Sequence, residues 1–265
     1  MLTVVHACLR NGAGGSPTAV LDESPMPDEE RRLVPARAGT SHAVFVAGDG
    51  ALRFFTSEGE LPACGHGTVA ALALLAHRSG RAEHLLRVGG RTFWGRAAGG
   101  ADGLFDAAFD PGPIRVRDPS PAELSETLAA IGVATEAGAA CVATLGRPRL
   151  LLPVADRATL AGLTPDRERL RATTERFGLL GCYVYSSPDA EGRAAARMFA
   201  PAIGVPEDIA NANGTACLAA HLGLDVRIDM GDSLGSPATV IARSRPGGIL
   251  VGGVASVAGA PGVRN

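Results

Sequence analysis

Two matched loops of the chain could hold a carboxylate. One reads Leu61-Pro62-Ala63-Cys64-Gly65-His66-Gly67-Thr68 and the other Asn211-Ala212-Asn213-Gly214-Thr215, and each leads into an apolar run. Backbone N–H groups at a helix N-terminus are unpaired and partly positive, so two such ends facing one cleft would bind an anion. Glycine and alanine in both loops would let a ligand approach the backbone. The alternative is that the glycines only permit tight turns, but two matched loops favour binding.

Several classes of chemistry are excluded by what the chain lacks. It contains no lysine, so Schiff-base chemistry, pyridoxal phosphate catalysis and a Walker A loop are ruled out. The five cysteines form no C-x-x-C pair, and neither they nor the six histidines have metal-ligand spacing, so we expect no metal site. An odd cysteine count and no secretory leader pattern favour a reducing, cytoplasmic location.

Charge and hydropathy exclude two kinds of partner. The net charge of −2 argues against a nucleic-acid-binding face, which must neutralise phosphates. The most apolar run, 69–76, is too short to span a bilayer, so no membrane association is expected.

The elements that must position the loops can be predicted from periodicity and caps. Ser120, Pro121 and Glu123 predict a capped helix that ends at Gly132. A second amphipathic helix follows 164–165, and short β-type runs fill much of the remainder.

A weak internal repeat predicts two similar lobes. Each half has a strand, a loop and a helix introduced by Gly-Thr, and both helices are apolar on nearly every face. A surface helix cannot be apolar all round, so each helix should be wrapped by the strands of its own half. Turn-rich residues 110–121 separate the halves, which gives an N-terminal lobe over 1–114 and a C-terminal lobe over 115–255. Residues from about 256 to 265 are a candidate for return to the first lobe.

In chain order, several motifs resemble those of the phenazine-biosynthesis PhzF-like family. Ser16 falls in a segment like G-N-P-x-A-V, His42 in one like S-E-T-x-F-V, and residues 60–66 resemble E-L-P-x-A-G-H. Residues 146–149 stand where a T-G-P-R-like turn is expected, and 201–208 resemble the family's S-P…E-D segment. The resemblance implies a diaminopimelate-epimerase-like α+β fold, with two lobes of curved, mostly antiparallel sheet around a buried central helix. It also implies a homodimer that isomerises small unsaturated carboxylates without a cofactor.

The resemblance assigns candidate catalytic residues, with departures. The family's acid/base glutamate is replaced by His42, which titrates near neutrality and could still exchange protons. His66 and Asp208 match functional positions; at a helix entrance the dipole disfavours the charged form of His66. Cys64 is a further candidate, because a helix N-terminus lowers the pKa of a thiol. The predicted substrate-binding residues are Ser16, Gly65, Gly67, Asn211, Asn213 and Gly214.

Three functions remain open at this stage. The preferred one is an isomerase that moves a proton and a double bond on a small cyclic carboxylate in antibiotic biosynthesis, with a pyrroline carboxylate (4-alkylproline precursor) as the favoured substrate. The first alternative is an amino-acid epimerase or racemase using Cys64, although Asn211 stands where a second thiol would be needed. The second alternative is a non-catalytic protein that binds small carboxylates.

Overall fold

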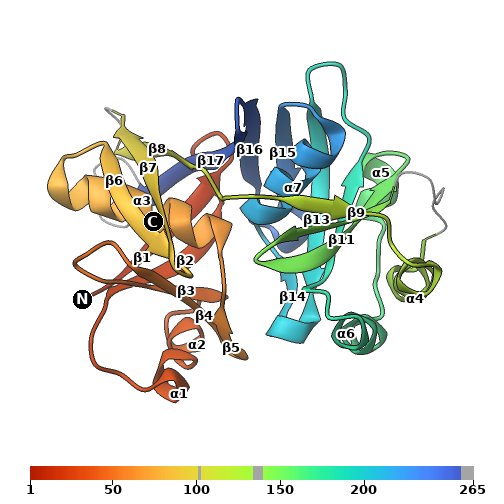
Figure 1. Ribbon diagram of the computed structural model, residues 1–265, viewed down its shortest axis with the longest axis horizontal. Coiled ribbons are helices and arrows are strands. Elements are labelled where there is room, and N and C mark those ends of the chain that lie inside the picture. The colour runs from red at the N-terminus through yellow and green to blue at the C-terminus, as the bar shows by residue number, and fades with distance from the viewer. Residues whose placement is uncertain (101–102, 134–139, 258–265) are drawn as a thin grey trace.

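The computed structural model describes residues 1–100, 103–133 and 140–257. Its helices are α1 Asp28–Arg31, α2 Val34–Arg37, α3 Gly65–Ser79, α4 Pro121–Ile131, α5 Arg157–Ala161, α6 Arg167–Arg176 and α7 Ala212–Leu222, with 3-10 turns at Pro201–Ile203 and Asp232–Leu234. Figure 1 shows two groups of strands side by side, one around α3 and one around α7.

The first group of strands forms a curved sheet around α3. Its strands are β1 Leu2–Leu9, β2 Ser16–Asp22, β3 His42–Val46, β4 Leu52–Thr56, β5 Gly59–Leu61, β6 Glu83–Val88, β7 Arg91–Gly99 and β8 Leu104–Phe109. They pair in the order β6-β7-β8-β17-β1-β2-β3-β4-β5, and only β2 and β3 run parallel. A bridge between Ala51 and Arg87 brings the two ends of this sheet together.

The second group of strands surrounds α7. Its strands are β9 Arg115–Arg117, β10 Cys141–Leu145, β11 Arg147–Val154, β12 Cys182–Ser186, β13 Arg193–Ala200, β14 Val205–Asp208, β15 Val226–Met230, β16 Ala238–Arg245 and β17 Gly248–Val257. Strands β11 and β12 run parallel, as do β13 and β15, and the other pairings in this group are antiparallel.

Strand β17 joins the two lobes. It pairs with β16 on the side of the second lobe and with β1 and β8 on the side of the first. Ser256 and Val257, at the start of the predicted returning tail, lie in these pairings; residues 258–265 are outside the described residues. The boundaries 1–114 and 115–255 stay a prediction.

The two central helices are buried as the all-round apolar pattern predicts. The first ten residues of α3 and the first eight residues of α7 are buried, so both helices supply core side chains. Both begin two residues before the predicted Gly-Thr pair, because Cys64 and Asn211 are the N-caps. The predicted lobes with buried central helices are confirmed.

The predicted caps of α4 are also confirmed. Ser120 Oγ accepts from the Glu123 N–H, the Glu123 carboxylate accepts from the Ser120 N–H, and Gly132 ends the helix in a left-handed conformation. Arg117 binds the same carboxylate through both terminal nitrogens, which ties β9 to α4. Among the described residues, no helix has the length and apolar character needed to cross a membrane.

Candidate active site

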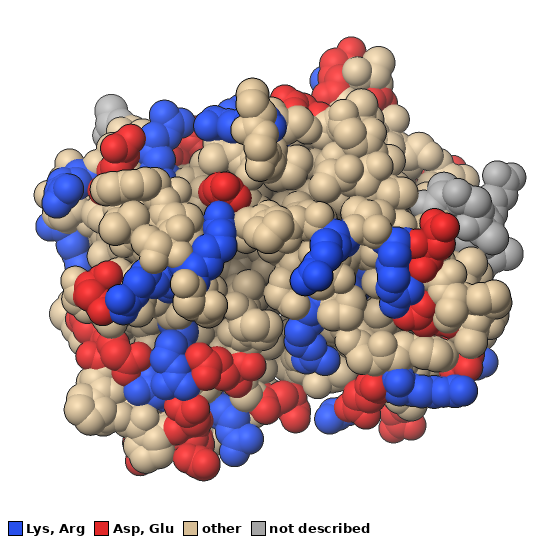
Figure 2. Space-filling model, viewed as in Figure 1, with Lys and Arg blue, Asp and Glu red and all other residues tan. Residues whose placement is uncertain are grey.

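A cavity lies between the lobes where the N-termini of α3 and α7 meet. The cavity is narrow: the space open to the centre of a water-sized sphere is about 30 Å³. Figure 2 shows this face hollowed between the lobes, with basic side chains on both sides of the hollow. Most of the predicted site residues line the cavity: His42, Cys64, Gly65, His66, Asp208, Asn211 and Asn213.

The two helix ends are in direct contact. A Cβ added to Gly65 would lie 2.6 Å from Ala212 Cβ and 2.9 Å from the Asn213 backbone nitrogen. Only a glycine fits there, and the first turns of α3 and α7 therefore present their unpaired N–H groups to the same small space. This is the arrangement that the two matched loops predict.

Three predicted binding residues lie outside the cavity lining. Gly67 is in the first turn of α3, where a Cβ would lie 2.9 Å from Val44, and Gly214 is in the first turn of α7, where a Cβ would lie 2.4 Å from the Tyr183 ring. Both glycines therefore serve close packing of the helix starts. Ser16 is fully buried at the start of β2 and does not line the cavity either.

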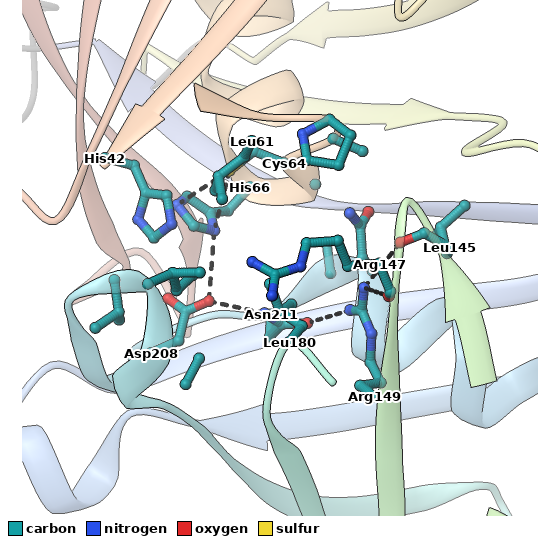
Figure 3. A pocket seen from close by; sticks show the side chains of 18 residues that line it. His42, Leu61, Cys64, His66, Leu145, Arg147, Arg149, Leu180, Asp208 and Asn211 are labelled. Atoms are coloured by element: carbon teal, nitrogen blue, oxygen red, sulfur yellow. Dashed lines mark hydrogen bonds and ion pairs between the residues drawn. The ribbon is translucent and has the colours of Figure 1, made fainter. Parts of the chain in front are cut away.

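Two imidazoles and a thiol lie together on one side of the cavity. His42 is on β3 and His66 is in the first turn of α3, and their ring centroids are 4.4 Å apart in an edge-to-face arrangement. Cys64 Sγ lies 3.6 Å from His66 Nε2. Figure 3 shows these side chains on one side of the cavity and Arg149 on the other.

Asp208 connects this cluster to the second lobe. Its Oδ2 lies 3.9 Å from His66 Nδ1 and accepts a hydrogen bond of 2.9 Å from Asn211 Nδ2. The amide oxygen of Asn211 in turn accepts from the Gly214 N–H and from Arg149. Asn211 therefore caps α7 and at the same time fixes the carboxylate that faces His66.

The two histidines have opposite pKa shifts. Burial, helped by the nearby His66, lowers the pKa of His42 well below its usual range, so His42 is neutral. Burial also acts to lower the pKa of His66, but Cys64 and Asp208 outweigh it and raise this pKa. The helix dipole, which is predicted to disfavour the charged form of His66, is thus opposed by Cys64 and by Asp208, and no local pattern places Asp208 beside the ring.

Two arginines in the cavity lining were not among the predicted site residues. Arg149, on β11, is only 1% exposed, and its guanidinium donates to Asn211 Oδ1 and to the backbone carbonyl oxygens of Leu145 and Arg147. It has no carboxylate partner in the described part of the chain, and Arg147 beside it also lines the cavity. A buried cation of this kind suits an anionic ligand. The sequence did contain a signal for Arg149: a charged residue directly before the apolar run 150–152 would be expected to be buried with the strand.

Unpartnered polar atoms gather at this site. Four buried side-chain atoms of the described residues have no hydrogen-bond partner, and two of them, Arg149 Nε and Asp208 Oδ1, belong to residues of the cavity lining. Buried polar groups are almost always paired, so these atoms indicate that a ligand supplies the missing partners.

The same cluster contains the donor atoms of a candidate metal site. One ligand atom from each of His42, Cys64 and His66 lies within 4.8 Å of the others. Sequence spacing predicted no metal site, because His42 is far from the other two in the chain and meets them only in the fold.

Comparisons with known proteins give the relatives of this chain. A family model described as "Phenazine biosynthesis-like protein" (PhzC-PhzF) matches residues 7–251. An uncharacterized isomerase from Deinococcus radiodurans is 30% identical over 275 residues, which cover 93% of this chain and 88% of that protein. The trans-2,3-dihydro-3-hydroxyanthranilate isomerase of Pseudomonas fluorescens is 28% identical over 87% of this chain and 85% of its own length.

A solved structure has the same fold. The structure of a predicted epimerase from Pseudomonas aeruginosa matches with a TM-score of 0.81 at 23% identity, over 97% of this chain and 96% of that one. This similarity confirms the α+β fold, diaminopimelate-epimerase-like, that the motifs imply.

Proposed function

Because the chain belongs to the phenazine biosynthesis-like protein family and is an isomerase, we propose that it moves a proton and a double bond on a small unsaturated cyclic carboxylate, without a cofactor. One observation carries the proposal: two contacting helix N-termini and a buried arginine border the same cavity as two adjacent imidazoles. The Pseudomonas fluorescens relative is named for its action on trans-2,3-dihydro-3-hydroxyanthranilate, which is an unsaturated cyclic carboxylate.

The carboxylate of the substrate binds at the N-termini of α3 and α7. The N–H groups there are partly positive, and the Arg149 guanidinium, buried beside Asn211, adds a full positive charge. The proton-transfer groups His42 and His66 lie on one side of the cavity and Arg149 lies on the other, so the ring of the substrate is held between them.

His42 removes the proton. The electron pair of the broken C–H bond forms a new double bond within the conjugated system, and negative charge accumulates towards the carboxylate. A second carbon then takes a proton, which restores the neutral ring with its double bond shifted. His66, beside Asp208, gives its own proton to this carbon, since its ring lies beside that of His42 and reaches the same face of the substrate. The proton held by His42 is then released to solvent and His66 takes up another from solvent, which restores both rings for the next turnover.

Charge stabilisation supports both proton transfers. The helix ends and Arg149 are fixed before the substrate binds, so they need no reorganisation when charge develops on the carboxylate. Fixed donors of this kind contribute as much to such reactions as the acid and base do.

A two-thiol epimerase is disfavoured by the geometry of the second lobe. Cys217 is the cysteine of α7, and it is fully buried in the core and outside the cavity lining. Asn211, which takes the place opposite Cys64, caps the helix and cannot act as a base.

We propose natural-product biosynthesis as the pathway, with a pyrroline carboxylate as the favoured substrate and a homodimer as the assembly. The favoured substrate follows from His42, which replaces the family's glutamate, and from the altered second loop at 211–213. Sedimentation of the purified protein tests the homodimer.

The test is proton exchange in D₂O followed by mass spectrometry and ultraviolet absorbance. The panel contains pyrroline carboxylates, trans-2,3-dihydro-3-hydroxyanthranilate and saturated amino acids. Deuterium in an unsaturated acid, together with an absorbance shift, is expected of the wild type and of the control variant His84→Ala. His84 is a half-buried histidine outside the cavity. His42→Ala should lose at least about 100-fold of this activity.

Other outcomes decide between the alternatives. Label only at the α-carbon of a saturated amino acid would establish an epimerase instead. Carboxylate binding without any exchange would establish a binding protein. Full activity in both His42→Ala and His66→Ala would refute the mechanism.

A further inference from the structure

We propose that His42, Cys64 and His66 form a zinc-binding site that opens into the cavity, and that zinc bound there stops proton transfer. Two imidazoles and a thiolate are a donor set that zinc prefers. All three side chains are buried, and each offers a ligand atom within 4.8 Å of the others. The second half of this inference rests on the proposed function; the binding of zinc does not.

The spacing of the donors suits tetrahedral zinc. Zinc–sulfur and zinc–nitrogen bonds of the usual lengths place the two ligand atoms about 3.6 Å apart at a tetrahedral angle. Cys64 Sγ is 3.6 Å from His66 Nε2 and 3.9 Å from His66 Nδ1, so the sulfur lies beside the ring, and the His66 imidazole must turn its Nε2 lone pair towards an ion shared with Cys64. The ligand atoms of the three residues lie within 4.8 Å of one another, so the side chains must also draw together around the ion.

A neighbouring group already orients one of the two imidazoles. Ser41 Oγ lies 2.9 Å from His42 Nδ1, within hydrogen-bond distance. Metal-bound histidines characteristically have such a partner at the nitrogen that does not bind the metal, so Nε2 is the expected ligand atom of His42. Asp208 Oδ2, 3.9 Å from His66 Nδ1, is too far for a hydrogen bond but places a negative charge beside the Nδ1 side of that ring.

The fourth coordination position faces the cavity. All three ligands line it, so a water molecule or a substrate carboxylate can complete the tetrahedron from that side. Coordination needs the thiolate of Cys64 and the neutral imidazole of His66, so the thiol proton and the extra proton of His66 both leave to solvent when zinc binds. With the ring nitrogens of His42 and His66 occupied, neither can accept or return a proton.

The test is a titration of the untagged protein with Zn²⁺ in a calorimeter and with Co²⁺ as a spectroscopic probe. We expect one zinc ion per chain and a thiolate-to-cobalt charge-transfer band. Cys64→Ala introduces the alanine that the E-L-P-x-A-G-H motif has at this position, so the variant should fold. It should lose the charge-transfer band, and its zinc affinity should fall by at least about 100-fold. Cys217→Ala, at a buried cysteine outside the cavity, should bind zinc as the wild type does.

The outcomes separate this inference from the proposed function. Equal zinc affinity in the wild type and Cys64→Ala, or equal loss in Cys217→Ala, would overturn the zinc site whatever the isomerase assay gives. Zinc binding without isomerase activity on any substrate would overturn only the proposed function. Zinc that binds at Cys64 and leaves proton exchange unchanged would overturn the inhibitory role.

Discussion

The contact between the two helix ends can be tested by adding one methyl group. In Gly65→Ala, the new Cβ would lie 2.6 Å from Ala212 Cβ, whereas carbon atoms pack at about 3.5–4.0 Å. The N-termini of α3 and α7 must therefore separate by about 1 Å. Overpacking of this size costs about 1–3 kcal/mol of stability. For a protein of this length we expect Tm to fall by about 2–10 °C.

The effect on activity should exceed the effect on stability. A displacement of about 1 Å at a site that orients the substrate lowers turnover by about 100-fold. Gly48→Ala is the matched control, because a Cβ there meets nothing within 4 Å and its backbone is not left-handed. Thermal unfolding and the D₂O exchange assay are run on both variants. If Gly65→Ala melts and turns over like Gly48→Ala, the helix ends do not meet as described.

Two further predictions concern charge. Arg149→Met should weaken the binding of a small cyclic carboxylate, measured by calorimetry, by about 10- to 100-fold, because a charged hydrogen bond is worth about 1.5–3 kcal/mol. The control variant Arg243→Met changes an exposed arginine and should bind the carboxylate as the wild type does. A hydrogen bond from Arg117 and, to a smaller extent, hydrogen bonds with Ser120 lower the pKa of Glu123 to about 2. The ionised carboxylate therefore contributes its full stability above its usual pKa, and this contribution is lost as pH falls from about 4.5 towards 2. Between pH 4.5 and 2 the free energy of unfolding of the wild type should therefore fall by about 1 kcal/mol more than that of Glu123→Gln; the value is small because Arg117 is half exposed and solvent weakens the ion pair. Equal pH dependence of the unfolding free energy in the two proteins would contradict this prediction.

Local patterns were enough to predict much of the fold. The cap of α4 depends on residues three apart, and the burial of α3 and α7 follows from their own apolar composition. Such features need no knowledge of distant contacts.

The charge state and the partners in the cavity could not be predicted in the same way. His42 reaches His66 only because β3 pairs beside β2 in the sheet around α3, and Arg149 reaches Asn211 across 62 positions of the chain. The pKa of His66 is raised by Cys64, two residues away, and by Asp208, which comes from the other lobe. These contacts depend on tertiary packing, which no local pattern encodes.

Strand β17 has a consequence for the order in which the protein folds during synthesis. It pairs Val5 with Val257 and fills the gap between β1 and β8, so the first lobe cannot complete its sheet until residue 257 has left the ribosome. Until then β1 and β8 have open edges, which are sites for pairing with other chains. The high contact order of this closure implies slow folding and a nascent chain that benefits from chaperones.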